Sequence, residues 1–130
     1  MNRRKRMQFW GRNEEDDSLV LQIERGEKTA TVCRAEDYHL AEGDYDDGGW
    51  EVGDLVEVYD LKENLRCLIE ITEVYPVKWS DIPEKLWKGE GNKNENGFKD
   101  DHISCWTEYE IDDSFEMMAT HFKLVENIKN

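Results

Sequence analysis

Two stretches of alternating apolar residues, joined by a short polar turn, constrain the fold of this chain more than any other feature. The stretches cover residues 54–60 and 65–74, and the turn between them is Lys62-Glu63-Asn64. Alternation with a period of two directs one face of a strand into a core, and two such strands around a short turn form an antiparallel hairpin. We therefore predict a hairpin whose second strand ends at Pro76, where the backbone lacks an N–H donor.

Shorter elements are predicted on both sides of this hairpin. An acidic start, a helically spaced apolar stripe and then Gly26 predict a helix that ends in a glycine cap. In chain order we predict a helix over 14–25, a strand over 29–33, a loop over 42–53, the hairpin, a short helix ending at residue 89, a polar flexible stretch over 90–97, a helix up to residue 109 and a strand over 117–125. Nothing repeats as strand-helix-strand, so the pattern predicts an α+β fold or a small β-barrel.

The charge balance limits the partners. The chain carries 31 Asp and Glu against 17 Lys and Arg, a net charge of −14 over 130 residues. This length predicts a single domain over residues 1–130, with residues 1–8, which contain Arg3-Arg4-Lys5-Arg6, as a flexible basic N-terminal tail. The negative charge repels polyanions, which argues against duplex DNA as a partner. A nucleoside, or a short single-stranded RNA in a locally basic pocket, stays compatible with it, and the oligomeric state is left open.

The cysteines and histidines follow no pattern of a disulfide framework or a metal site. Cys33, Cys67 and Cys105 are widely separated without C-x-x-C spacing, and the three histidines are isolated from one another. The acidic segment 44–49 lacks ligands that an EF-hand loop requires. No apolar run is long enough for a signal peptide or a membrane span. We therefore predict a cytoplasmic protein with no metal, no cofactor and no membrane partner.

The segment of greatest chemical interest is GEKTAT at residues 26–31, between the first predicted helix and the first predicted strand. It is not a phosphate-binding loop, because the glycine spacing of G-x-x-x-x-G-K-[ST] is missing. By itself it also fits a helix cap, an exposed lysine and the start of a strand. In a regular strand Lys28 and Thr31 would point to opposite faces, so their cooperation requires a turn or bulge near Gly26.

Four features, each weak alone, together resemble the ASCH domain family. They are Phe9-Trp10, GEKTAT at 26–31, Glu90-Gly91-Asn92 after a short helix, and the helical segment around Trp106. The resemblance covers residues 9–125 and looks closest to the acidic bacterial branch related to N4-acetylcytidine amidohydrolases. It implies a PUA-like fold, which is a small, mostly antiparallel β-barrel with flanking short helices. The chain departs from the family signature at Cys33, where the family has an arginine, and Arg34 stands one position later.

The resemblance implies catalytic roles for Lys28, Thr31 and Glu90 in hydrolysing the amide of N4-acetylcytidine. A threonine hydroxyl becomes a good nucleophile when a base takes its proton, and lysine can be that base only when it is neutral. A neighbouring carboxylate such as Glu90 would favour the charged form of the lysine instead. Two alternatives follow. Either Glu90 is the base while Lys28 stabilises the developing oxyanion, or Glu90 orients the cytosine amine.

Further residues are predicted to bind substrate around this site: Gly26, Thr29, Arg34, Trp50 and Trp87. Trp50 and Trp87 flank predicted irregular segments, where an indole ring can stack on a base. The alternative function is a non-catalytic PUA-like module that binds RNA or a modified nucleotide without turnover, since fold similarity does not establish chemistry. RNA cleavage is disfavoured by the acidic composition and by the lack of paired histidines.

Overall fold

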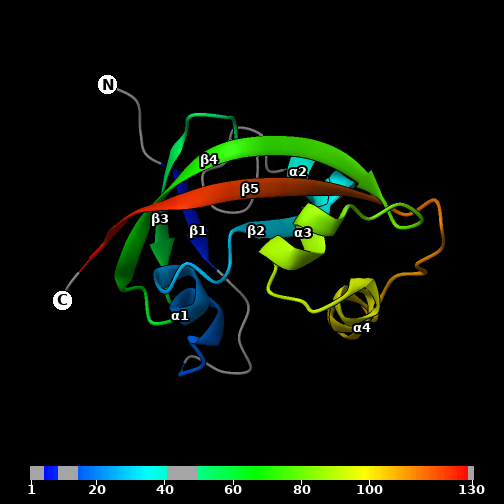
Figure 1. Cartoon of the computed structure of the whole chain (residues 1–130), viewed down its shortest axis with the longest axis horizontal. Coiled ribbons are helices and arrows are strands. Elements are labelled where there is room, and N and C mark those ends of the chain that lie inside the picture. The colour runs from blue at the N-terminus through cyan, green and yellow to red at the C-terminus, as the bar shows by residue number, and fades with distance from the viewer. Residues whose placement is uncertain (1–4, 9–14, 41–49, 129–130) are drawn as a thin grey trace.

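The computed structural model of this chain describes residues 5–8, 15–40 and 50–128. At its centre is one five-stranded sheet in the order β1-β3-β4-β5-β2, curled into half of a barrel (Figure 1). β1 runs parallel to β3, and the other neighbouring pairs are antiparallel. The strands are β1 (Lys5–Gln8), β2 (Ala30–Arg34), β3 (Leu55–Tyr59), β4 (Leu65–Lys78) and β5 (Glu116–Asn127). The predicted α+β class, with a mostly antiparallel sheet, is confirmed.

The predicted hairpin is present as β3 and β4. Leu55 pairs with Glu70 and Val58 with Cys67. The prediction that the second strand ends at Pro76 is wrong, because β4 continues to residue 78 and pairs with β5 over that length. β3 borders β4 only as far as Glu70, so beyond it one edge of β4 has no ladder partner among the described strands. A proline is tolerated at such an edge because no ladder hydrogen bond is lost there.

Four helices lie within the described residues: α1 (Ser18–Glu24), α2 (Ala35–Leu40), α3 (Glu84–Gly89) and α4 (Glu95–Cys105). The glycine predicted to end α1 adopts the left-handed conformation, since Gly26 has a φ of 75°. α4 begins inside the stretch predicted as flexible over 90–97. Asn94 accepts a hydrogen bond from the Gly97 N–H at 2.7 Å and so caps this helix, a role that the sequence interpretation did not assign to it.

Residues 5–8, which the sequence analysis placed in a flexible tail, form β1. They pair with β3 from Lys5 opposite Val56 to Gln8 opposite Tyr59. Met7 is 4% exposed, so the apolar side chain that directly follows the basic run is buried in the core and fixes this part of the chain. The remaining residues of the predicted tail, 1–4, and the Phe9-Trp10 pair lie outside the described residues.

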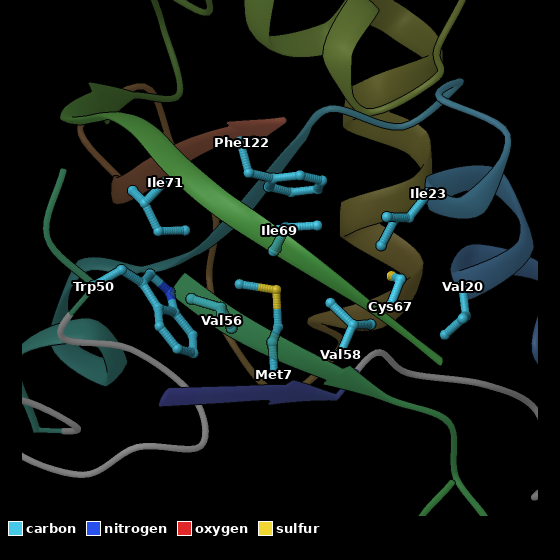
Figure 2. Close-up of a cluster of buried hydrophobic side chains, with 10 residues drawn as sticks. All are labelled: Met7, Val20, Ile23, Trp50, Val56, Val58, Cys67, Ile69, Ile71 and Phe122. Atoms are coloured by element: carbon cyan, nitrogen blue, oxygen red, sulfur yellow. The ribbon is translucent and has the colours of Figure 1, made fainter. Parts of the chain in front are cut away.

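Two clusters of buried side chains fill the fold. In the first, Figure 2 shows Met7 of β1 directed toward Val56 and Val58 of β3, with Trp50 beside them. The second joins residues of the sheet to residues of α3 and α4, two helices that lie at the opposite end of the curled sheet from α1 (Figure 1). Its members are Ala30, Val77, Trp79, Ile82, Leu86, Phe98, Met117 and Ala119. No helix in the described part of the chain is long and apolar enough to cross a membrane.

Candidate functional site

A cavity of about 660 Å³ lies between the two ends of the sheet order. β1 contributes Met7 and Gln8 to its wall, and β2 contributes Thr31 and Cys33. α4 borders it from another side through His102. Since β1 and β2 are the outermost strands of the described sheet, the cavity occupies the opening where the curled sheet does not close on itself. Its size is within the range of sites for small organic ligands.

Lys28 reaches this cavity from the irregular segment that precedes β2. Its backbone N–H donates to the carbonyl of Gln22 at 3.1 Å, and the N–H of Thr29 donates to the carbonyl of Gly89 at 2.7 Å, so the strand ladder begins only afterwards. The irregularity that the sequence required is therefore present. Lys28 and Thr31 line the same cavity although three positions separate them.

The Lys28 side chain is 4% exposed and its ammonium group lies between two acceptors. Nζ donates to the Ala30 carbonyl at 2.8 Å and to Glu90 Oε1 at 2.5 Å. A buried ammonium needs such partners, because removing it from water without them costs several kcal/mol. The pair is an ion pair, and this geometry favours the interpretation in which Lys28 is charged.

Glu90 is placed by a close approach between α3 and β2. It is the C-cap residue of α3 and follows Gly89, which packs directly against the start of β2. A Cβ atom on Gly89 would lie 2.7 Å from the Cβ of Ala30 and 3.2 Å from Thr29 Oγ1. Only glycine permits this contact, and the contact sets the position of the carboxylate beside Lys28.

His102 completes the charged cluster, and the sequence interpretation missed it. Its Nε2 lies 2.9 Å from Glu90 Oε2, and its Nδ1 lies 2.7 Å from the carbonyl oxygen of Phe98. The ring stacks on Phe98 with centroids 4.1 Å apart and tilts against Trp106 at 5.0 Å. Phe98, His102 and Trp106 recur every four residues along one side of a helix, and this spacing is the signal that could have indicated the cluster.

The electrostatics of the cluster favour an ionised Glu90. Burial raises the pKa of this carboxyl group, since its side chain is 7% exposed, but the Lys28 ammonium and His102 outweigh burial and hold the pKa below its usual value. Glu90 thus carries a negative charge at neutral pH, with the Lys28 ammonium against one oxygen and His102 Nε2 against the other. We refer below to Lys28, Glu90 and His102 as the buried triad.

Several predicted site residues meet at the cavity and others do not. Lys28, Thr31, Glu90 and Trp50 all line it. Trp50 was expected in an open loop, but it is 4% exposed and belongs to the first core cluster, so only part of its ring is available to a ligand.

The other four predicted binding residues are not among the described residues that line the cavity. Gly26 and Thr29 are exposed, and Thr29 contributes through its backbone contact to Gly89. The Arg34 guanidinium lies over the Tyr109 ring at 3.7 Å and 3.5 Å from Glu36. Trp87 packs against the second core cluster.

The polar wall of the cavity carries more carboxylates than cations among its described residues. Asp16, Asp101 and Glu90 are the carboxylates, and Lys28 is the cation, with the His102 imidazole beside them. Asp101 accepts a hydrogen bond from the Asn92 amide at 2.8 Å, which fixes both side chains at the rim. Within the described ranges, no three His, Cys, Asp or Glu side chains converge as metal ligands would.

Comparison with known proteins gives a family for this arrangement. A family model described as ASCH domain matches residues 5–126. No curated protein matches the chain. The matched range spans nearly the whole chain. It contains the buried triad, β1 to β4, and β5 up to its last residue but one.

Solved structures share the fold at low sequence identity. A protein from Enterococcus faecalis has a TM-score of 0.77 at 16% identity, covering 98% of this chain and 79% of its own. An ASCH domain from Lactobacillus crispatus has a TM-score of 0.71 at 19% identity, covering 92% and 79%. A variant of an ASCH protein from Zymomonas mobilis has a TM-score of 0.55 at 10% identity, covering 95% and 71%. These likenesses confirm the predicted PUA-like fold and concern the fold alone.

Proposed function

This chain belongs to the ASCH domain family, and on that premise we propose that its cavity binds a nucleobase, either in a nucleoside or in a short single-stranded RNA. The observation that carries the proposal is the buried triad at the wall of the cavity. A carboxylate held between two donors is a fixed hydrogen-bond acceptor. Such an acceptor suits the exocyclic amine of a base such as cytosine.

The other residues that line the cavity suit a nucleobase better than a phosphate group. Trp50 and Trp106 border it and offer partial aromatic faces, and base–aromatic stacking contributes about 1–3 kcal/mol where it occurs. Phosphate groups are bound by clustered arginine and lysine or by helix N-termini. Here Asp16 and Asp101 line the cavity and the Lys28 charge is already paired with Glu90. The uncharged nucleoside is therefore the favoured form of the ligand.

We further propose that a cytosine acylated on its 4-amino group is a substrate. Thr31 Oγ would attack the acyl carbon, the C–N bond would break, and the hydroxyl proton would pass to the departing 4-amino nitrogen. Cytidine leaves, and the acyl group stays as an ester on Thr31 until water hydrolyses it to the carboxylic acid and restores the hydroxyl. In this scheme the charged Lys28 stabilises the oxyanion, and Glu90 carries the proton after giving up one of its two contacts.

A second candidate function is binding without turnover, and one observation favours it. Both oxygens of Glu90 are engaged, Oε1 by Lys28 and Oε2 by His102. A carboxylate with a lowered pKa and a contact on each oxygen is a weak base. Recognition of a base edge requires no proton transfer and would leave these contacts in place.

Incubation of the full chain with N4-acetylcytidine separates the two candidates. If hydrolysis occurs, chromatography should detect cytidine and acetate in equal amounts, and Thr31→Val, which removes the hydroxyl at nearly constant volume, should abolish their release. If the cavity only binds, no product forms, but N4-acetylcytidine or cytidine should still quench tryptophan fluorescence in a saturable manner. Lys28→Met should weaken that binding. Absence of both turnover and saturable binding would refute the proposed function.

A further inference from the structure

His102 has geometry that the proposed chemistry does not yet use. Its side chain is 14% exposed, lines the cavity and contacts the second oxygen of Glu90 at 2.9 Å. We propose that His102 is the positioning residue of the cavity: as an imidazolium it holds Glu90 in one orientation, so that the carboxylate can accept a hydrogen bond from a ligand. The effect on ligand binding rests on the proposed function, whereas the protonation state of His102 can be tested without it.

The hydrogen-bond partners assign the proton on each ring nitrogen. The Phe98 carbonyl oxygen can only accept, so Nδ1, at 2.7 Å from it, must be the donor. In neutral histidine Nε2 would then present a lone pair to Glu90 Oε2, and the two acceptors would repel each other. Because Lys28 at 2.5 Å keeps Glu90 ionised, the favourable arrangement is the one in which Nε2 also carries a proton.

The packing around the ring keeps this arrangement in place. Phe98, which is fully buried, stacks on one side of the imidazole, and Trp106 contacts it at a centroid distance of 5.0 Å. Rotation of the ring would break the hydrogen bond to Phe98 and this stacking together. His102 is thus fixed by its own helix, and it transmits that fixed position to a carboxylate at the end of a different helix.

Two donors on different oxygens define the plane of the Glu90 carboxylate. A carboxylate has about four lone-pair positions, so those not used by Lys28 and His102 stay available for a ligand. Among the described residues, the other charged groups that border the same cavity are Lys28 before β2, Glu90 after α3, Asp101 on α4 and Asp16 before α1. Loss of the His102 proton at high pH would remove one donor from Glu90 and increase the excess of negative charge at the cavity. Binding should therefore weaken as the pH rises.

The protonation state is tested by nuclear magnetic resonance of the imidazole nitrogens in the full chain without ligand. We expect both nitrogens to be protonated near neutral pH, and we expect Glu90→Gln to shift deprotonation of the ring to lower pH. A neutral ring with a proton on one nitrogen near neutral pH would overturn the inference, whatever the protein binds.

The positioning role is tested with cytidine as the probe between about pH 5 and pH 9, which includes the range of about pH 5 to 8 in which histidine commonly changes charge. His102→Phe keeps the stacking but removes both donors, and it should weaken binding about ten- to a hundredfold. His102→Gln can still donate to Glu90 but does not titrate. It should bind about tenfold more tightly than His102→Phe, with the pH dependence lost. Equal binding by wild type and His102→Phe would overturn the positioning role, whereas failure of wild type to bind cytidine would count against the proposed function instead.

Discussion

Two charged clusters in this chain use similar side chains in different surroundings. In the first, the Arg66 cluster, Arg66 of β4 contacts Asp17 at 2.8 Å, Glu24 at 2.6 Å and Asp60 at 3.3 Å. One cation thus joins the start and end of α1 to the β3–β4 turn. Asp17 is 35% exposed and Glu24 21% exposed, so water shares the charges of this cluster.

In the buried triad the central group is a carboxylate and not a cation. One carboxylate, Glu90, lies between two donors, and the Lys28 and Glu90 side chains are 4% and 7% exposed. The triad borders the cavity, whereas none of the four residues of the Arg66 cluster is among the described residues that line it. Water therefore stabilises the first cluster much more than the second.

The difference indicates which cluster serves the structure and which serves a ligand. An ion pair near the surface costs little desolvation and links elements that are distant in sequence. A buried ion pair costs several kcal/mol of desolvation, and apolar residues of similar volume would often stabilise a fold equally well. A buried cluster of ionisable groups with a perturbed pKa, open to a cavity, is therefore a candidate for function.

The largest effect should follow from removing the cation of the buried triad. Lys28→Met leaves Glu90 buried with His102 as its remaining side-chain partner among the described residues, and we expect a loss of about 3–5 kcal/mol in the free energy of unfolding. Urea denaturation measures it. The double variant Lys28→Met/Glu90→Gln also removes the unpaired buried carboxylate, and it should recover more than half of the lost stability. A smaller loss of unfolding free energy in Lys28→Met than in Arg66→Met would contradict this comparison of the two clusters.

A smaller effect should follow from displacing Glu90 without changing any charge. In Gly89→Ala the new Cβ would lie 2.7 Å from Ala30 Cβ, so α3 and β2 must separate, at about 1–3 kcal/mol. Cytidine binding should weaken in the same variant, because the carboxylate moves away from Lys28. Urea denaturation and fluorescence quenching measure the two effects.

Gly97→Ala in the first turn of α4 is the matched control for this change. A Cβ there would meet Asn94 Oδ1 at 3.4 Å, and the helical backbone favours alanine over glycine by about 0.5–1 kcal/mol. We expect this variant to be at least as stable as wild type. Equal destabilisation by the two alanines would show that the close approach at Gly89 has no special role.

The Arg66 cluster should contribute stability but not ligand binding. Arg66→Met leaves Asp17 and Glu24, which water partly solvates, and the buried Asp60, which still accepts hydrogen bonds from the Lys62 and Asn64 N–H groups. We expect a loss of about 1–2 kcal/mol. Added salt should narrow the gap between wild type and Arg66→Met more than the gap between wild type and Lys28→Met, since screening acts mainly on exposed charges. Cytidine affinity should be unchanged in Arg66→Met. A change in affinity would mean that the two clusters are coupled.

The smallest expected effect concerns the stability of the fold at acid pH. Burial raises the pKa of Asp60, but hydrogen bonds from Asn64, Lys62 and Arg66 outweigh it and lower the pKa below the usual value. Stability from such a group is fully present above its unfolded pKa of about 3.9 and is lost as the pH falls through the lower folded value. Asp60→Asn should therefore reduce stability at neutral pH by about 1 kcal/mol and narrow its difference from wild type below pH 4. A constant difference across this range would contradict the assignment.

Much of the fold follows from local patterns in the sequence. The alternating residues of 54–60 and 65–74 predict the hairpin, the glycine at residue 26 predicts the end of α1, and the β-branched run predicts β2. β1 could not be predicted in this way, because the short polar segment Lys5–Gln8 forms a strand only where Met7 is buried in the core and β3 offers an edge. The extension of β4 past Pro76 likewise depends on which strands border it.

In the candidate site, too, some features follow from the sequence and others only from the folded structure. The sequence by itself determined the chemical groups and the family resemblance: Lys28, Thr31 and Glu90 in recognisable segments, and the need for an irregular backbone between the first two. The tertiary structure alone decided that Lys28 and Glu90 form a buried ion pair, that His102 joins them, and that Arg34 pairs elsewhere. The reason is physical: periodicity and turn chemistry act between neighbours in sequence, whereas desolvation and the pairing of charges 62 residues apart depend on contacts that exist only in the folded chain.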